Sequence, residues 1–168
     1  MTSIIKVDQI QNAAGVGGLT IDSNGIISTA QRPSFHVYYE ASGVVGVGGT
    51  IVFTGVRDNT GSHYNTSTGK FVAPVAGLYQ FNFSGFGCNS SGGTLSSGSS
   101  SVGFASDTYG GNYHITYGYA NASHHPNLSF STSHRLAANE GVYINTGNSY
   151  LYQDSSMQYL YFSGYYVG

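Results

Sequence analysis

Hydrophobic and polar positions alternate in several short runs of the chain. In residues 77–86, Tyr79, Phe81 and Phe83 fall on one side of the backbone and polar side chains fall on the other. A period of two predicts a half-buried β-strand. Further runs that we expect to be strands, separated by turn residues, are 34–39, 49–54, 70–72, 102–105, 113–117, 128–132, 141–145 and 158–167. Many short strands without a convincing helix predict an all-β sandwich or jelly roll.

The last of these runs carries aromatic side chains on both faces. Leu160 and Phe162 lie on one face, while Tyr161 and Tyr165 lie on the other. We expect such a strand to pack one face on the core and the other on a second protein surface. The rings expected in the core or in a subunit interface are Tyr79, Phe81, Phe83, Tyr159, Tyr161, Phe162 and Tyr165.

The first 32 residues follow a different pattern, with scattered aliphatic side chains and no aromatic ones. Asn24-Gly25 between two alternating runs predicts a β-hairpin, whereas residues 4–11 fit a helix face or a strand equally well. A segment this small cannot form its own core, so it must pack on the main domain, on its own copies or on a partner. We therefore divide the chain into a docking segment, 1–32, and a main domain, 33–168. The expected docking residues are Ile4, Ile5, Val7, Ile10, Leu19 and Ile21.

Charge is scarce in this sequence. Of 168 residues 7% are charged and 14% are aromatic, and the net charge is −2. With five Lys and Arg residues, we expect no electrostatic binding of nucleic acid. Weak charge repulsion favours association and burial in a larger assembly. The start of the chain lacks a basic stretch followed by a long apolar run, so we expect synthesis in a cytosol without secretion or membrane insertion.

Six histidines and one cysteine raise a metal or catalytic hypothesis. His124 and His125 are adjacent, so on a strand they point to opposite faces, and no carboxylate or cysteine stands beside them at a ligand spacing. Cys88 is expected to be an incidental thiol in a mobile loop rich in Ser and Gly, residues 87–101. We therefore expect no metal, no cofactor and no enzymatic activity.

Tyrosines in the loops between strands offer another role. Tyrosine rings stack on other flat or apolar surfaces and their hydroxyl groups form hydrogen bonds, which suits carbohydrate. The alternative interpretation is that these are ordinary strand and interface tyrosines. The residues of such a receptor surface, within 87–101 and 106–127, are Tyr109, Tyr113, Tyr117, Tyr119, His124 and His125.

Three motifs occur in a fixed order along the main domain. A Tyr-Asn-x-x-Thr-Gly-Lys-Phe turn at residues 64–71 precedes Pro-x-x-Gly-x-Tyr-x-Phe at 74–81, and Phe-Ser-Gly-Tyr stands at 162–165. This order resembles the globular head domain of complement, the C1q domain, over about residues 33–168. The resemblance implies a jelly roll of the tumour-necrosis-factor (TNF) type that forms a tight homotrimer. Family members that bind calcium or immune ligands use charged loop residues, which are few here, so those sites are not implied.

The front of the chain is similar to a different group of proteins. Residues 3–12 and 18–25 resemble the start of many virion proteins of tailed bacteriophages, especially those of cyanobacteria. The resemblance implies a leader that docks on other capsid or tail proteins while a trimeric head faces outward. The expected function is a non-enzymatic virion structural protein, a fibre or capsid decoration assembled in the host cytoplasm. The alternative is a receptor-binding fibre tip that recognises a host-surface glycan through its loops.

Overall fold

The computed structural model describes residues 7–15, 17–29 and 32–168. The chain divides into two units, Met1–Arg32 and Pro33–Gly168, and each is described by itself. The regular elements of the described residues are all β-strands, and their pairings are all antiparallel.

The first unit contains a three-stranded sheet of β1 (Gln9–Gln11), β2 (Gly17–Ile21) and β3 (Ile27–Ser28). The predicted hairpin at Asn24-Gly25 is confirmed, since β2 pairs with β3. The Asp22 carboxylate accepts hydrogen bonds from the backbone NH groups of Asn24 and Ile26, both at 2.8 Å. Gly25 has φ +79°, a left-handed conformation that glycine adopts without strain. Residues 9–11 are strand rather than helix, and Ile4 and Ile5 lie outside the described residues.

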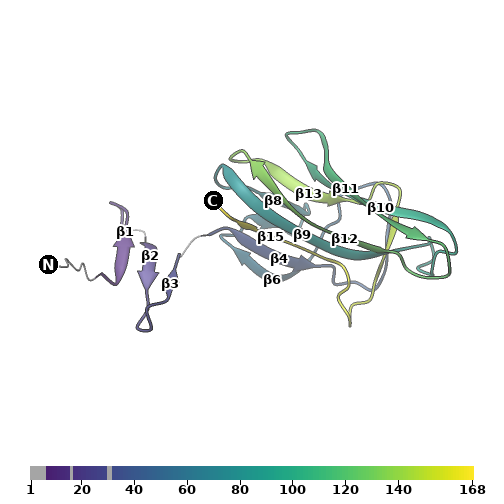
Figure 1. The fold of residues 1–168 in the computed structure, drawn as a ribbon, viewed down its shortest axis with the longest axis horizontal. Helices are drawn as coiled ribbons and strands as arrows, with labels where there is room; N and C mark the ends of the chain where they lie inside the picture. The colour runs from purple at the N-terminus through teal and green to yellow at the C-terminus, as the bar shows by residue number, and fades with distance from the viewer. Residues whose placement is uncertain (1–6, 16, 30–31) are drawn as a thin grey trace. The chain divides into compact units, whose positions relative to one another are not determined.

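The second unit is a sandwich of two sheets, which confirms the predicted all-β fold (Figure 1). The five-stranded sheet has the order β11-β10-β13-β8-β7, and the seven-stranded sheet has the order β5-β14-β9-β15-β4-β6 with β12 paired to β9. The strands are β4 (Ser34–Tyr38), β5 (Gly43–Val45), β6 (Gly55–Thr60), β7 (Tyr64–Asn65), β8 (Lys70–Val72), β9 (Gly77–Cys88), β10 (Gly98–Ser106), β11 (Gly111–Ala120), β12 (Asn127–Leu136), β13 (Gly141–Asn145), β14 (Tyr150–Gln153) and β15 (Tyr161–Tyr166).

Aromatic rings fill the space between the two sheets. Phe81 on the central strand β9 is fully buried, and every second side chain of β9 points with it into the core. No side chain fits at Gly164 of β15, because a Cβ atom there would lie 2.6 Å from the Phe81 ring. The ring of Phe81 lies between 4.7 and 6.4 Å, centre to centre, from the rings of Phe35, Phe71, Phe104 and Phe162.

The turn between β7 and β8 shows why the motif at residues 64–71 has its sequence. The Asn65 side chain accepts a hydrogen bond from the backbone NH of Ser67 at 2.8 Å, and the Asn65 carbonyl accepts one from Gly69 at 2.9 Å. Gly69 has φ +73°, and a Cβ atom there would lie 2.4 Å from the carbonyl oxygen of Ile51. Glycine is therefore needed both for the backbone angle and for the close approach.

The strand predicted at residues 49–54 is wrong. Ile51 and Phe53 are buried, but in this segment only Thr50 forms a bridge, to Asn145. The alternation of residues in this segment therefore indicates which side chains enter the core, and it does not indicate a paired strand. The neighbouring polar residues form β6 instead, which the apolar pattern did not indicate, and β5, β7 and β14 were also not predicted.

The loop predicted at residues 87–101 is wrong at both ends, while residues 89–97 do connect two strands as expected. Strand β9 continues through Cys88 and β10 begins at Gly98, so regular pairing occupies both ends. Between them, the Asn89 side-chain oxygen accepts hydrogen bonds from the backbone NH groups of Ser91 and Gly93, both at 2.9 Å. Ser and Gly can extend a strand here because the backbone, not the side chain, makes the pairing hydrogen bonds.

Candidate interaction surfaces

The outer face of the seven-stranded sheet, which points away from the core, has two chemically different halves. Cross-strand pairing places side chains from β12, β9, β15 and β4 in rows across this face. One row consists of Ser133, Gln80, Tyr165 and Ser34, and the next consists of Ser131, Asn82, Ser163 and His36. We call the β12 and β9 part the polar half: Gln80, Asn82, Ser84, Ser129, Ser131 and Ser133. The β15 and β4 part is the aromatic half: His36, Tyr38, Tyr161 and Tyr165.

The polar half is held together by hydrogen bonds among its own side chains. The Gln80 amide donates to the Ser131 hydroxyl at 2.9 Å, and Ser133 donates to the Gln80 carbonyl at 2.6 Å. Ser131 in turn donates to Asn82 at 2.9 Å. These groups are uncharged and satisfy one another, so covering them with protein would isolate no charge.

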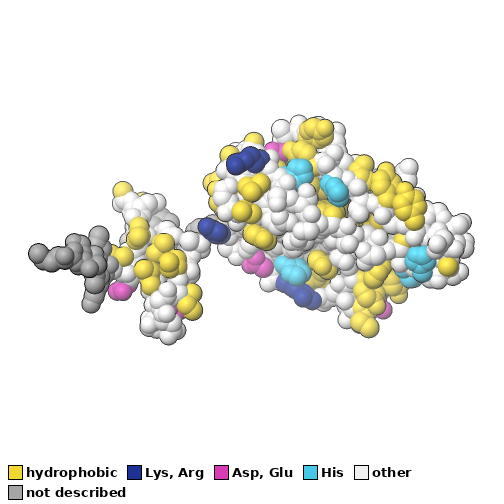
Figure 2. Space-filling view, viewed as in Figure 1, with side chains coloured by type: hydrophobic (Ala, Val, Ile, Leu, Met, Phe, Trp, Pro, Cys, Tyr) yellow, Lys and Arg dark blue, Asp and Glu magenta, His cyan; other side chains and the backbone are white. Residues whose placement is uncertain are grey.

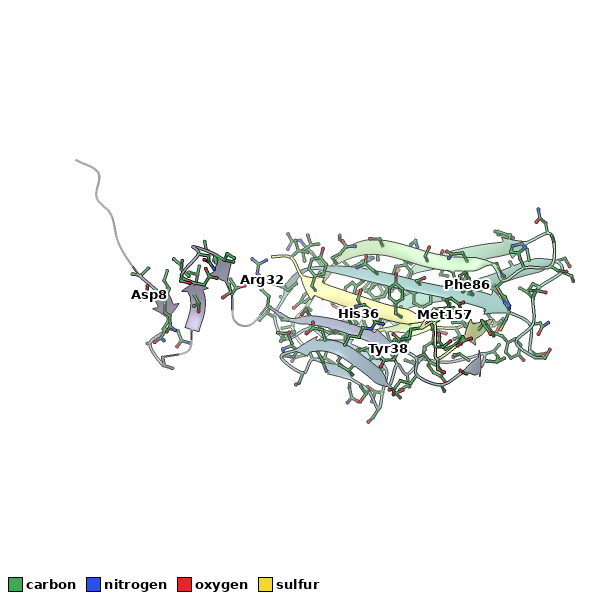
Figure 3. The ribbon with its side chains drawn as sticks, turned by 90° about the horizontal axis from the view of Figure 1, so that it is seen from below. Asp8, Arg32, His36, Tyr38, Phe86 and Met157 are labelled. Carbon is green, nitrogen blue, oxygen red and sulfur yellow. The ribbon has the colours of Figure 1, made fainter. Side chains whose placement is uncertain are left out.

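A hollow of about 250 Å³ lies where the aromatic half meets the edge strand β6. We call it the edge hollow; His36 and Tyr38 come from β4, and Met157 comes from the segment before β15 (Figure 3). The Arg57 guanidinium lies 5.5 Å from the centre of the Tyr38 ring. Burial, together with this guanidinium, lowers the pKa of His36. The complete lining is His36, Tyr38, Arg57, Met157, Gln158 and Tyr161.

The rings predicted for the core or an interface separate into two groups. Tyr79, Phe81, Phe83 and Phe162 are buried in the core. Tyr159, Tyr161 and Tyr165 point outward, and Tyr165 keeps half of its surface exposed. The Tyr159 ring lies 5.1 Å from Phe86, in a second hollow of about 220 Å³ whose lining is Phe86, His125, Tyr152 and Tyr159.

The residues predicted for a receptor surface do not form one site. Tyr109 precedes β11 and stacks 5.1 Å from Tyr113 near the start of that strand, whereas Tyr119 lies near its end. The His125 ring stacks on Tyr152 at 4.8 Å, and the Nδ1 atom of His124 lies 2.8 Å from the Ala122 carbonyl oxygen. Tyr119 is 72% exposed and its ring is 6.4 Å from that of Tyr117, which makes these two the most accessible ring pair of the set.

A buried carboxylate holds Tyr113 in place, and no motif or spacing in the sequence indicates this contact. Glu140 is 5% exposed and accepts hydrogen bonds from the Ser106 hydroxyl at 2.5 Å, from the Ala137 backbone NH at 2.9 Å and from the Tyr113 hydroxyl. Burial acts to raise the pKa of Glu140, but these hydrogen bonds and the nearby His134 outweigh it, so the pKa is lowered. The His134 ring stacks on the Tyr113 ring with centres 4.5 Å apart. Burial, and after it the charge of His114, lowers the pKa of His134.

Cys88 does not lie in an exposed loop as predicted. It is the last residue of β9, is 2% exposed and forms no disulfide. Burial raises the pKa of its thiol to about 11. Because the thiolate is the reactive form, this position disfavours nucleophilic chemistry.

One face of the small N-terminal sheet is aliphatic. Ile10 is paired with Leu19, and Ile21 is paired with Ile27, so these four side chains share a face. Ile10 is 54% and Ile27 is 62% exposed, while Leu19 and Ile21 are half-buried. Val7, ahead of β1, is also exposed. The predicted docking residues Ile10, Leu19 and Ile21 therefore share one aliphatic face of this small sheet.

The side chains that could ligate a metal ion are scattered in the described part of the chain. There, no three His, Cys, Asp or Glu side chains are grouped closely enough to hold a metal ion. No helix among these residues is long and apolar enough to cross a membrane.

Similar proteins were identified from sequence and from structure. Residues 35–167 match the family model of the C1q domain. The globular domain of zebrafish complement 1qA has a similar fold, with a TM-score of 0.62 and 16% identity over 81% of this chain and 98% of that one. The Eiger TNF from S. frugiperda has a TM-score of 0.63 and 10% identity, over 82% of this chain and 94% of that one. Murine APRIL has a TM-score of 0.60 and 8% identity, over 82% of this chain and 100% of that one.

No curated protein matches the sequence significantly. The two-sheet topology, the turn at residues 64–71 and the match over most of the chain agree with one another. C1q and TNF-like domains are typically non-enzymatic binding or structural modules, and they form homotrimers. From residue 35 to residue 167, this chain is a member of the C1q domain family, with the all-β jelly-roll fold of C1q and TNF-like proteins.

Proposed function

We propose that the protein is a non-enzymatic structural module that forms a homotrimer and attaches to a larger assembly through its N-terminal sheet. The observation that carries the proposal is the combination of a C1q domain with a separate small sheet that has an aliphatic face. Membership of a trimer-forming family supports self-association. The scarcity of charge supports extensive burial in an assembly, and few charged side chains are visible on the larger unit (Figure 2).

The subunit contact is assigned to the polar half and the adjoining Tyr165. Interface centres are depleted in charged residues, and none of these side chains is charged. Four of its side chains, Gln80, Asn82, Ser131 and Ser133, are already linked by hydrogen bonds, which lowers the cost of burying them. The half-exposed Tyr165 ring supplies apolar area beside them.

A charge placed in the polar half tests the trimer. Ser131→Lys puts one ammonium group on this face of each subunit, where burial without a partner is costly. We expect sedimentation velocity to show dissociation into monomers. Ser99→Lys, at an exposed position on the five-stranded sheet, is the matched control and should remain trimeric. If Ser131→Lys stays a trimer with unchanged stability, the interface lies elsewhere.

The assembly is proposed to be the virion of a tailed bacteriophage. The resemblance of residues 3–12 and 18–25 to phage virion leaders supports this choice, and so does the aliphatic face that these residues help to form. Burying this face against capsid or tail proteins would supply the docking energy, and three leaders per trimer would multiply it. The protein would then fold in the host cytoplasm and reside in the particle.

Docking is tested with the full chain and purified virions or capsid shells. Replacing Ile10 and Ile27 together by Asn should abolish co-sedimentation with the particles while leaving a trimer. Ser28→Asn, whose residue pairs with Thr20 on the opposite face of the same sheet, should bind normally. Equal binding of the double variant and the original protein would contradict the proposed anchor.

A receptor-binding tip is the second candidate, favoured by the exposed ring pair of Tyr117 and Tyr119. Adjacent exposed rings on one strand offer a platform for a glycan. On this hypothesis, Tyr119→Ala should lose binding to a host-surface glycan that the original trimer retains on an array. Tyr109→Ala, at the other end of β11, is the control. Absence of any glycan binding by the original trimer would remove this candidate.

A further inference from the structure

A hollow of about 330 Å³ lies at the end of the sandwich where the chain passes from β9 to β10. We call it the serine hollow. Its walls come from the connection between β9 and β10, the start of β10 and the turn between β13 and β14, and they include no charged side chain. The lining residues that carry the argument are Leu95, Ser100, Asn148, Ser149 and Tyr150.

Two nearly enclosed hydroxyl groups in this wall have unused hydrogen-bonding capacity. Ser100 is 3% and Ser149 is 7% exposed. The Ser149 hydroxyl accepts a hydrogen bond from the Ser101 backbone NH at 2.6 Å, which leaves its own hydrogen to donate. The Ser100 hydroxyl bonds to no group in the described part of the chain, and no fully enclosed polar side-chain atom there lacks a partner, so this hydroxyl reaches the hollow. Buried hydroxyls normally have partners, so both groups are placed for a ligand that replaces water.

The segments around these hydroxyls are held by hydrogen bonds of their own. The backbone of Leu95 donates to His124 at 3.0 Å and accepts from it at 3.3 Å, which joins two connections at this end of the domain. On the other side, the Ser149 backbone NH donates to the Thr146 carbonyl at 3.0 Å. Walls that are already ordered reduce the entropy lost when a ligand binds.

The chemistry of the serine hollow defines the class of ligand. A charged ligand would lie there without a charged partner, which disfavours it. The serine hydroxyls and the Asn148 amide offer both donors and acceptors, while Leu95 and the Tyr150 ring offer apolar surface. A neutral sugar ring has the same two kinds of surface, hydroxyl groups and C–H faces. The volume is at the lower end of the range for small-molecule sites and holds about one or two sugar rings.

The serine hollow lies away from the rows of side chains assigned to the subunit contact. Strand β9 reaches it at Cys88, four positions and about 13 Å beyond Ser84, the last residue of the polar half on that strand. The chain enters the domain at the opposite end, because the Pro33 carbonyl accepts a hydrogen bond from Tyr166, which pairs with Tyr79 near the start of β9. A site in this position is compatible with the proposed trimer.

We propose that the serine hollow binds a neutral hexose residue of a polysaccharide, with sugar hydroxyl groups bonded to Ser100, Ser149 and Asn148. The inference goes beyond the structural function. It uses neither residue of the Tyr117 and Tyr119 pair, so each of the two hypotheses can fail without the other.

The test is saturation-transfer NMR of the full chain with the methyl glycosides of glucose, galactose and mannose. The matched ligand is 2-methoxytetrahydropyran, because it keeps the ring and lacks the hydroxyl groups. We expect a Kd of about 1 mM for at least one glycoside and at least about tenfold weaker binding of the matched ligand. Absence of transfer to all of the glycosides at about 5 mM would overturn the proposal, and so would equal binding of the matched ligand.

Two variants locate the site. Ser100→Ala removes a hydroxyl that has no partner in the described part of the chain, so the variant should fold normally and bind at least about fivefold more weakly. Asn148→Ala removes an exposed amide at the same site and should weaken binding by about threefold to fivefold. Asn121→Ala, at an exposed position in the connection between β11 and β12, is the matched control and should bind as the original protein does.

Three results would contradict the assigned site. Unchanged binding by both Ser100→Ala and Asn148→Ala would place the sugar elsewhere. Loss of binding in Tyr119→Ala alone would place it on the tyrosine pair of β11. Tighter binding by a monomeric Ser131→Lys variant than by the original trimer would show that subunit contact covers the hollow.

Discussion

Replacing Glu140 by Ala should destabilise the domain more than most single substitutions. The carboxylate lies in the turn between β12 and β13 and joins β10, β11 and that turn through three hydrogen bonds. A hydrogen bond to a charged group contributes about 1.5–3 kcal/mol, and a buried donor left without its acceptor costs about 1–3 kcal/mol. Ser106 is fully buried and would lose its acceptor, whereas Tyr113 is half-exposed and can turn to water. We expect a loss of about 3–5 kcal/mol in the free energy of unfolding.

The same contacts predict how the loss depends on pH. The pKa of Glu140 is lowered in the folded protein from its ordinary value of 4.5. A group of this kind stabilises the fold fully above its unfolded pKa, and the contribution disappears as pH falls through the lower folded pKa. Glu140→Gln has no titrating group at this position. The difference in unfolding free energy between the original protein and Glu140→Gln should therefore be largest near neutral pH and shrink below about pH 4.5.

Urea unfolding at one protein concentration, followed by circular dichroism, measures both effects. Asp107→Asn is the control, because it breaks the partly exposed ion pair with Lys70 and should cost no more than about 1 kcal/mol. A cost below about 1 kcal/mol for Glu140→Ala would refute the structural role of the carboxylate. A difference between the original protein and Glu140→Gln that stays constant from neutral to acid pH would refute the direction of the pKa shift.

Three further predictions concern the core, a turn and the thiol. Phe162→Ala should lower the free energy of unfolding by about 3–5 kcal/mol in urea titrations because the fully buried ring leaves a cavity, and a loss under about 1 kcal/mol would contradict the packing. Gly69→Ala should cost at least about 1 kcal/mol, since both the φ angle and the Ile51 carbonyl oppose a Cβ atom, and a stabilised variant would show that the turn is misassigned. Cys88, with its pKa raised to about 11, should react with iodoacetamide far more slowly in the folded protein than in urea, and equal rates would place the thiol at the surface.

The parts of the fold that could be predicted have local signals. Alternating aromatic and polar residues identify β9, because a half-buried strand requires that pattern, and a run rich in aromatic residues identifies β15. Asn24-Gly25 identifies its hairpin through backbone preference alone. The polar strand β6 and the Ser-rich start of β10 have no such signal, since their pairing depends on backbone groups that every residue carries.

The candidate sites were harder to predict because they join distant segments. Arg57 meets Gln158 from 101 positions away, and Glu140 meets Ser106 from 34 positions away. Neither pair has a characteristic spacing, and Gln158 and Glu140 lie in connections between strands, so only the complete fold brings the partners together. Conversely, Tyr109 and Tyr119 are close in sequence, yet the extended β11 separates them. Ile10 is exposed in a segment too short to provide a core, and its docking role stays a prediction.

Self-association of the protein into a trimer can be tested by measuring its molecular mass in solution. Sedimentation equilibrium would be run on the full chain and on residues 33–168, which contain the whole aromatic core. For a homotrimer we expect three times the mass of one chain in both cases, where the full chain weighs 17.7 kDa. A monomeric mass for both at micromolar concentration would contradict the proposed trimer. A trimer that forms only with residues 1–32 present would show that the N-terminal sheet, and not the C1q domain, holds the subunits together.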